Sequence, residues 1–393
     1  MRICFVTGEY PPMQGGVGDC THELGCALMQ LGHQITVITS TRAMGSAPHS
    51  QALEPQVHPI VDRWNWSSWR CILSQVQSDQ GEILHIQYQT AAYAMHPAIN
   101  LLPLRVRWCS NRPRVVVTFH DLRVPYLFPK AGAIRSWANL QLARWSDAAI
   151  VTNQEDHRQL KTARLPTGLR WIPIGSNIAP QAPAGYARDT WRRRLGVAPS
   201  DLLLCYFGFL NESKGGETLV RCLAALRDRG CAAKLVMIGG NVGDSDPTNV
   251  AFFEHVKALA VELGLSDWIQ WTGYVPSEQV TASFWAADAC VLPYTDGVSF
   301  RRGSFMAALA HGMPIVSTLP QHGNPLLING ENILLVPPDE PASTAEAVER
   351  IASAPKLRDR LSRGASALAE RFTWERIAAQ TAELYRELST QRG

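Results

Sequence analysis

Short apolar runs alternate with helical patterns along almost the whole chain, and this alternation restricts the fold more than any other feature of the sequence. The first run, at residues 2–7, is followed by a glycine-rich loop, by a helical pattern from about Val17 to Leu31, and by a second run at residues 34–40. A strand, a glycine-rich turn, a helix and another strand form a βαβ unit, in which the two strands pair in parallel.

The alternation occurs as two series. The first predicts further strands at residues 83–86, 115–119, 148–152 and 171–173, and helices near residues 67–77, 97–108, 134–145 and 153–162. Residues 179–190, APQAPAGYARDT, have the composition of a linker. The second series predicts strands at residues 202–209, 234–240, 268–273, 288–294, 313–318 and 332–336, with helices within 211–230 and at 249–263, 277–285, 342–352 and 357–371 and a closing helical pattern at 372–388.

Chain length agrees with two domains, because 393 residues exceed what one ordinary hydrophobic core organises. The sequence therefore predicts the α/β class, with two doubly wound, Rossmann-like domains in tandem. Open α/β sheets bind ligands at the carboxyl ends of their strands, so we expect the site in the cleft where the two sheets face each other.

Composition narrows the functional classes. The net charge of +3 gives no case for a nucleic-acid partner. Nine cysteines without a CxxC pair are typical of reduced thiols in a cytoplasmic protein, not of a zinc site. The N-terminal apolar run is too short for a secretion signal, and no stretch approaches the ~20 apolar residues of a membrane span. We expect a cytoplasmic protein, and a peripheral contact with the inner face of the membrane stays open.

Residues 296–318, DGVSFRRGSFMAALAHGMPIVST, have the features of an anion site. A strand precedes this stretch, a helix is expected to open at about Gly303, and Ser304 suits its N-cap. The first amides of a helix carry the positive end of its dipole, and Arg301 and Arg302 stand beside them. The segment predicts binding of a phosphate-like group.

Three other loops at strand ends contain candidate residues. Gly15 and Gly16 precede the first helix, where a ligand could approach the backbone, and the alternative is a plain tight turn. His120 follows an apolar strand and could contact a hydroxyl or move a proton, although a structural role is equally open. Lys214 precedes Gly215 in a loop where a lysine can reach phosphate, although most lysines are solvated.

Several patterns favour structural interpretations. The glycine spacing after the first strand is not GxGxxG and the second strand ends without an acidic residue, which argues against a nicotinamide cofactor. Asp244 and Asp246 resemble a DxD metal motif but lie in a polar loop where they favour turns, so no metal site is predicted. His85 and His96 are expected to be structural. Residues 134–145 suggest a core-facing helix more than an interfacial one.

Several motifs together resemble one family, the family 4 glycosyltransferases of the GT-B fold. The resemblance runs through EYPPMQGGVGD, VVVTFHD, IPIGSNI, NESKGGETLV, the segment from WIQWTG to VLPY, AALAHGMPIVST and FTWERIA. These motifs occur in the family's order and at its spacing, over nearly the entire chain.

The resemblance implies a retaining, metal-independent hexosyltransferase without a cofactor. Its donor is a nucleoside-diphosphate sugar, and its acceptor is a sugar, a lipid-linked molecule or a small molecule. It implies an acceptor-side domain at residues 1–180, with the helix at 373–390 packing back on it, and a donor domain at 190–370. The resemblance implies that His120 is catalytic and contacts the transferred sugar, that Gly15, Gly16 and Lys214 contact the diphosphate, and that the base and ribose contact Tyr274, Val275 and Ser299. On physical grounds, the anion site at Arg301, Arg302, Gly303 and Ser304 is expected to supply further contacts to the diphosphate.

The chain departs from the family pattern at three positions. Phe209 stands where the family carries arginine, and Ser299 and Ala307 stand where it carries two glutamates. We interpret the chain as a divergent but active member, in which Arg301 and Arg302 replace the charge missing at Phe209. The alternatives are a weakly active or inactive protein that binds a nucleotide sugar or a partner, and an isomerase, for which no clear pair of acid and base carboxylates is found.

Overall fold

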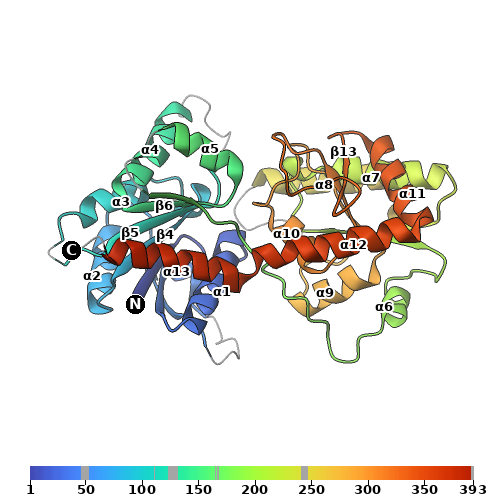
Figure 1. Ribbon diagram of the computed structural model, residues 1–393. Coiled ribbons are helices and arrows are strands. Elements are labelled where there is room, and N and C mark those ends of the chain that lie inside the picture. Colours follow the sequence, from blue (N-terminus) through green and yellow to red (C-terminus); the bar gives the residue numbers. More distant parts are fainter. Residues whose placement is uncertain are drawn as a thin grey trace. The chain divides into compact units, whose positions relative to one another are not determined.

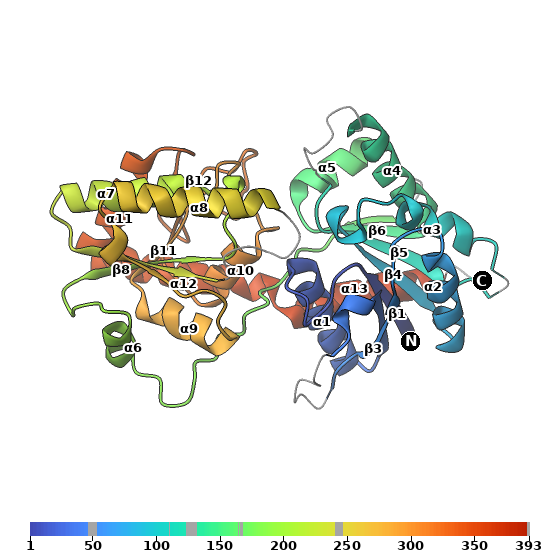
Figure 2. The same ribbon diagram turned by 180° about the vertical axis from the view of Figure 1, so that it is seen from behind.

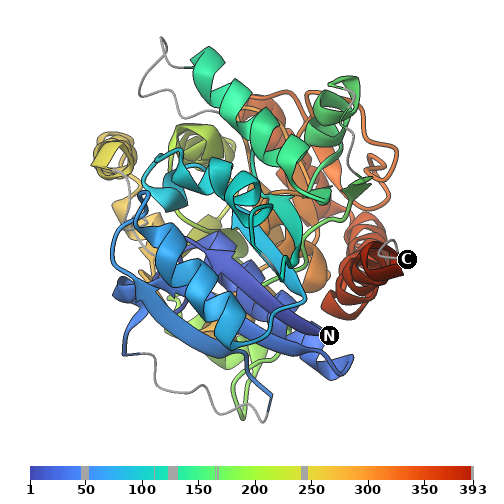
Figure 3. The same cartoon turned by 90° about the vertical axis from the view of Figure 1, so that its left-hand side faces the viewer.

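The computed structural model describes residues 1–45, 53–109, 111–122, 132–163, 165, 168–239 and 247–390. It divides into two compact units (Figure 1). Unit 1 comprises Met1–Asn177 and Thr373–Gly393, and unit 2 comprises Ile178–Phe372. Both ends of the chain therefore belong to unit 1, as Figure 3 shows for the N-terminus and the C-terminal helix.

Unit 1 is built on a parallel sheet of seven strands in the order β3-β2-β1-β4-β5-β6-β7. The strands are β1 (Arg2–Thr7), β2 (Gln34–Ser40), β3 (Gln56–Val61), β4 (Ile83–Tyr88), β5 (Arg114–Phe119), β6 (Ala148–Val151) and β7 (Gly168–Trp171). The helices are α1 (Gly16–Gln30), α2 (Ser68–Ser78), α3 (Ala98–Val106), α4 (Gly132–Trp145), α5 (Gln154–Thr162) and α13 (Trp374–Thr390).

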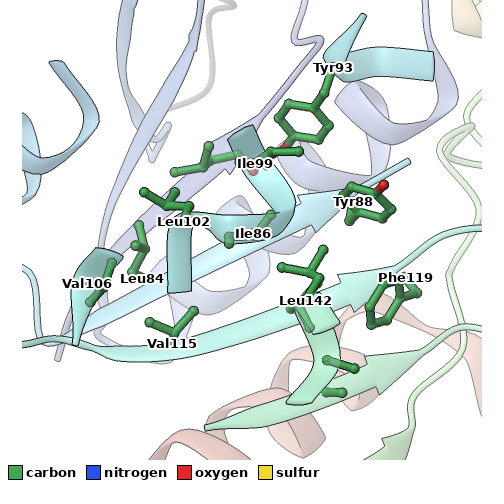
Figure 4. Packing of buried hydrophobic residues seen from close by; sticks show 14 of the residues in the cluster. Leu84, Ile86, Tyr88, Tyr93, Ile99, Leu102, Val106, Val115, Phe119 and Leu142 are labelled. Carbon is green, nitrogen blue, oxygen red and sulfur yellow. Dashed lines mark hydrogen bonds between the residues drawn. The ribbon is translucent and has the colours of Figure 1, made fainter. Parts of the chain in front are cut away.

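Both faces of this sheet are buried, because its strands carry apolar side chains on each side. On one face, Leu84 and Ile86 of β4 pack with Ile99 and Leu102 of α3 and with Leu142 of α4 (Figure 4). The other face is covered by α1 and α13, whose buried apolar residues form a second cluster with β1 and β2. The last helix of the chain thus completes the core of the first unit.

Unit 2 contains a parallel six-stranded sheet in the order β10-β9-β8-β11-β12-β13. Its strands are β8 (Leu202–Phe207), β9 (Ala233–Ile238), β10 (Ile269–Trp271), β11 (Ala289–Leu292), β12 (Ile315–Thr318) and β13 (Leu334–Val336). Its helices are α6 (Arg188–Arg194), α7 (Gly216–Asp228), α8 (Pro247–Glu262), α9 (Ser277–Ala286), α10 (Gly303–Ala310), α11 (Pro341–Ser353) and α12 (Pro355–Ala369). Helices α7 and α8 lie on one face of the sheet and α9 on the other (Figure 2).

The predicted fold class, two doubly wound α/β domains, is confirmed. Two elements were not predicted. Strand β3 lies at the edge of its sheet and is mostly half-buried, so it lacks an apolar run. Helix α6 occupies the end of the predicted linker, where the guanidinium group of Arg192 is buried and donates 2.9 Å to the carbonyl oxygen of Ala286. In the described part of the chain, no helix is both long and apolar enough to cross a membrane.

The packing of α13 generates a stability prediction. Leu384 is 2% exposed within the unit 1 core, so we expect Leu384→Ala to lower the free energy of unfolding by about 2–5 kcal/mol through lost contacts and a cavity. The neighbouring Glu383 is exposed, so Glu383→Ala should change the free energy of unfolding by less than about 0.5 kcal/mol. Urea unfolding followed by circular dichroism measures both. Equal effects of the two substitutions would contradict the packing.

Candidate functional site

The loops at the carboxyl ends of β8 and β11 meet in unit 2. Gly208, just after β8, has φ 118°, and a Cβ atom there would lie 3.5 Å from the Cβ of Ser304 in α10. Gly215 has φ 68°, and its Cβ would lie 1.8 Å from the carbonyl oxygen of Pro293 after β11. Only glycine tolerates these positions, and this close approach places Lys214 beside the start of α10.

Lys214 contacts both Ser304 and Tyr294. Its Nζ donates 3.4 Å to the Oγ of Ser304 and lies 5.3 Å from the centre of the Tyr294 ring, while the Tyr294 hydroxyl is 2.7 Å from the same Oγ. Burial, and after it the charge of Arg302, lower the pKa of Lys214 to about 7. The ammonium group therefore lies in an environment that disfavours its charge.

Arg301 and Arg302 are both held by Asp296. The Nη2 of Arg301 donates 3.0 Å to one carboxylate oxygen, and the Nη2 of Arg302 donates to the other. Arg302 also donates 3.1 Å to the Oγ of Ser213, and its guanidinium carbon lies 4.7 Å from the centre of the Tyr294 ring. Both arginine side chains are about one-tenth exposed. One carboxylate thus fixes two guanidinium groups next to Lys214, and positive charge predominates in the cluster.

The prediction that Ser304 is the N-cap of α10 is wrong. The helix begins at Gly303 with Arg302 as its N-cap, and no side chain caps it. Ser304 lies within the first turn, where its hydroxyl contacts Tyr294 and Lys214. The first amides of a helix lack intrahelical partners, so the start of α10 keeps the donor character expected of an anion site.

The residues expected to hold the base and ribose lie in two places. Tyr274 is 70% exposed and half-buried Val275 follows it, in the turn after Gly273, which bridges to Gly239 at the end of β9. Ser299 precedes the two arginines, and its buried Oγ has no hydrogen-bond partner within the described residues. Ala307 is fully buried inside α10.

In unit 1, the glycine-rich loop before α1 lies against a carboxylate of the chain itself, that of Glu9. An Oε1 of Glu9 accepts 3.0 Å from the amide of Val17 and 3.4 Å from that of Gly18, at the start of α1. Burial raises the pKa of Glu9, and the two amide bonds oppose this rise. Gly15 lies against this carboxylate, whereas a Cβ atom on Gly16 would meet nothing within 4 Å.

Further carboxylates lie along the first turns of α1. Burial raises the pKa of Asp19, which accepts 2.9 Å from the Nδ2 of Asn177, and burial together with the charge of Asp19 raises the pKa of Glu23 to about 7. Sequence reasoning singled out the glycines and missed these acidic side chains. The only signal was their spacing at one helix start, which is also the pattern of an ordinary N-terminal turn.

His120 is joined to a chain of buried polar groups. Its Nε2 is 2.8 Å from the Oε1 of Gln87, and the Nε2 of Gln87 is 3.5 Å from the Nε2 of His85. His85 bonds Thr118 at 2.7 Å and the hydroxyl of Tyr385 in α13 at 2.5 Å. Burial lowers the pKa of His120 to about 4 and that of His85 to about 3. A neutral His120 that donates Nε2–H to Gln87 keeps Nδ1 as a hydrogen-bond acceptor.

His85 and His96 have structural contacts, as expected; the Nδ1 of His96 accepts 3.1 Å from the amide of Ala98. Asp244 and Asp246 lie outside the described residues. In the part of the chain that the structure describes, no three His, Cys, Asp or Glu side chains are grouped so that they could hold a metal ion.

Two family models match the chain, one on each unit. The model described as Glycosyltransferase Family 4 matches residues 14–179, and that described as Glycosyl transferases group 1 matches residues 201–354. Together the two models cover both units and support membership of the family 4 glycosyltransferases. The two matches lie on either side of the predicted linker, so each doubly wound unit corresponds to one glycosyltransferase domain.

Curated relatives include D-inositol 3-phosphate glycosyltransferases of Streptomyces species. Those of Streptomyces griseus and Streptomyces bingchenggensis are 30% identical over 218 and 253 residues, which is 55% and 63% of this chain and 45% and 54% of theirs. The chain thus spans about half the length of the curated relatives that it matches.

Solved structures share the fold. Sucrose-phosphate synthase from Thermosynechococcus elongatus superposes with a TM-score of 0.80 at 21% identity and covers 100% of both chains. Anabaena HepE, determined in complex with UDP-glucose, superposes with a TM-score of 0.76 at 17% identity and covers 98% of this chain and 100% of its own. These likenesses establish the GT-B fold.

The contact between Gly15 and Glu9 generates a prediction. The backbone at Gly15 is extended, so any residue fits its dihedral angles, but a Cβ atom would lie 2.2 Å from the Glu9 carboxylate. Gly15→Ala should displace the carboxylate and leave the start of α1 without its acceptor, at a cost of about 1–3 kcal/mol of unfolding free energy.

Gly16→Ala is the matched control, because it adds a methyl group in open space at the first residue of α1. It should be neutral or stabilise by up to about 1 kcal/mol. Thermal and urea unfolding measure both variants. If Gly15→Ala were as stable as Gly16→Ala, Glu9 would not be a significant cap of α1.

Proposed function

We propose that this chain transfers a hexose from a nucleoside-diphosphate sugar to an acceptor with retention of configuration. One observation carries the proposal: Lys214, Arg301 and Arg302 gather beside the unpaired first amides of α10 at the carboxyl edge of the unit 2 sheet. Transfer from a diphosphate needs positive charge where the leaving group develops negative charge. The UDP-glucose bound by HepE supports a donor of this class.

The three cations have different roles in this proposal. Asp296 fixes the arginines, so they offer preorganised donors for the bridging and terminal phosphate oxygens. Lys214 is a mobile point charge with a pKa lowered to about 7. A bound diphosphate raises that pKa, so the lysine takes up a proton from solvent on binding and faces the leaving group as a cation. Protein cations then neutralise the diphosphate, and the proposal requires neither a metal ion nor a cofactor.

The remaining residues have more specific proposed roles. His120, held by Gln87, presents its acceptor nitrogen Nδ1 to a hydroxyl of the transferred sugar. The turn at Tyr274 and Val275 holds the base, and the buried hydroxyl of Ser299 contacts the ribose. Gly15 and Gly16 contact the donor through backbone only, because Glu9 already binds the amides of Val17 and Gly18. The acceptor is a sugar, a lipid-linked molecule or a small molecule.

A pH-dependent affinity follows from Lys214. Because its pKa in the free protein is about 7 and an anion raises it, nucleoside diphosphate binding takes up a proton. We expect affinity to fall by up to about tenfold for each pH unit above 7, where the terminal phosphate is already ionised. Calorimetry with UDP, GDP and ADP between pH 6.5 and 9.5 measures the slope, and buffers of different ionisation enthalpy measure the proton uptake.

Lys214→Arg is the control, because arginine stays charged throughout this range and should bind without the pH slope. A parallel assay follows sugar release or transfer from UDP-, GDP- and ADP-sugars, with the anomeric configuration of the product read by NMR. Absence of binding to all three diphosphates would contradict the proposed site. Binding without turnover would instead identify a weakly active or inactive nucleotide-sugar-binding protein.

Gln87 provides a test of the role of His120. In Gln87→Glu, a carboxylate replaces the amide next to the imidazole, which favours the protonated form and raises the pKa of His120 from about 4. If catalysis requires neutral His120, activity on the acidic side should fall at a higher pH than in the wild type. The pH profile of kcat/KM measures this shift. Gln159→Glu, at an exposed position of α5, should leave the profile unchanged, and an unshifted profile in Gln87→Glu would remove His120 from the mechanism.

A further inference from the structure

Unit 1 contains a hollow at the opposite edge of its sheet from His120. The cavity has a volume of about 1180 Å³ and is lined by the first residues of β1 and β5, by the chain just before β4, by α2 and by the end of α3. Strand β5 separates it from the candidate catalytic residue, because Arg114 begins the strand and His120 follows its end. Six residues of strand correspond to about 20 Å.

The walls of this cavity carry an excess of positive charge. The described lining includes five arginines and one acidic residue, Glu82. Asp147 compensates the two deepest guanidinium groups, those of Arg112 and Arg114. Arg70 and Arg105 are exposed on α2 and α3, and neither bonds a carboxylate among the described residues. Such guanidinium groups suit carboxylate or phosphate oxygens, which they bind in pairs of hydrogen bonds.

Three tryptophans form the apolar part of the same walls. Trp69 is fixed by a 2.9 Å hydrogen bond from its Nε1 to the carbonyl oxygen of Ala98. Trp66 meets it edge to face, with ring centres 5.1 Å apart and an angle of 83°. Trp108, after α3, is 81% exposed and Trp66 is 49% exposed. Exposed apolar surface that is gathered in one groove, as these indole rings are, marks ligand-binding sites more often than singly exposed rings do.

We propose that this cavity, here named the Arg–Trp groove, binds an anionic carbohydrate, meaning sugar rings that carry carboxylate or phosphate groups. Indole faces pack against the apolar faces of sugar rings, and the arginines bind the oxyanions and hydroxyls. The volume exceeds the ~300–1,000 Å³ typical of small-ligand pockets and so accommodates several linked rings. The proposal concerns binding only and does not depend on the transfer reaction.

Two other classes of anionic partner fit less well. A membrane surface is bound by helices whose apolar side chains protrude, whereas most of these rings and guanidinium groups line a concavity. Single-stranded nucleic acid needs aromatic faces on which successive bases stack, whereas Trp66 and Trp69 stand nearly perpendicular. The sugar rings of an oligosaccharide change direction at each linkage. Successive rings can therefore pack against tryptophan rings that stand at an angle to each other.

Titration of the full chain with small carbohydrates tests the proposal. The probes are trigalacturonate, which carries carboxylates, glucose 6-phosphate, which carries phosphate, and maltotriose as the neutral counterpart. Tryptophan fluorescence and calorimetry report binding. We expect an acidic probe to bind at least tenfold more tightly than maltotriose, and the stronger of the two acidic probes identifies the oxyanion.

Two variants and two controls locate the site. Arg70→Gln combined with Arg105→Gln, and separately Trp108→Ala, should each weaken acidic-probe binding at least tenfold. The controls are Arg221→Gln on α7 and Trp137→Ala on α4, both at exposed positions outside the groove. They should leave acidic-probe binding unchanged, and circular dichroism checks that every variant is folded. Equal binding of acidic and neutral probes, loss in the controls, or binding only to phosphatidylglycerol vesicles or to single-stranded DNA would each overturn the proposal.

Discussion

The parallel pairing of every strand in the two sheets determines where this protein can do chemistry. Parallel strands deliver their following loops to one edge, so Gly208, Lys214, Tyr294 and the start of α10 converge in unit 2 although they are far apart in sequence. The loop after β8 can approach α10 only because Gly208 and Gly215 adopt positive φ values. The cationic cluster is therefore a consequence of sheet topology and of two glycines.

Much of this arrangement was predictable from the sequence. A buried strand appears as a short apolar run, and a helix with one buried face appears as a helical apolar pattern. The grouping of Lys214 with Arg302 and Ser304 follows from the same rule about strand ends. Asp296 was not predictable as the partner of both arginines, since a turn aspartate reads as a turn former. The carboxylate of Glu9 was equally hidden, because a side chain that folds back onto helix amides leaves no periodic signal.

The missed elements have a common cause. Strand β3 lies at a sheet edge and α6 carries four arginines in seven residues, so neither shows the apolar periodicity on which prediction depends. Helix α6 is held by tertiary contacts instead, above all by the buried guanidinium group of Arg192, which bonds Ala286 and Asp288. Local propensity gives little information where a long-range ionic contact decides the structure.

The place of α13 has a consequence for how the protein is made. Unit 2 lies between the two segments of unit 1 in the sequence, so a ribosome releases all of unit 2 before it releases the helix that covers α1 and supplies Tyr385 to His85. Domains generally fold as units during synthesis. The second unit therefore completes its fold first, while the nascent first unit still lacks the helix that covers α1, and loss of α13 damages the part of the protein that was translated earliest.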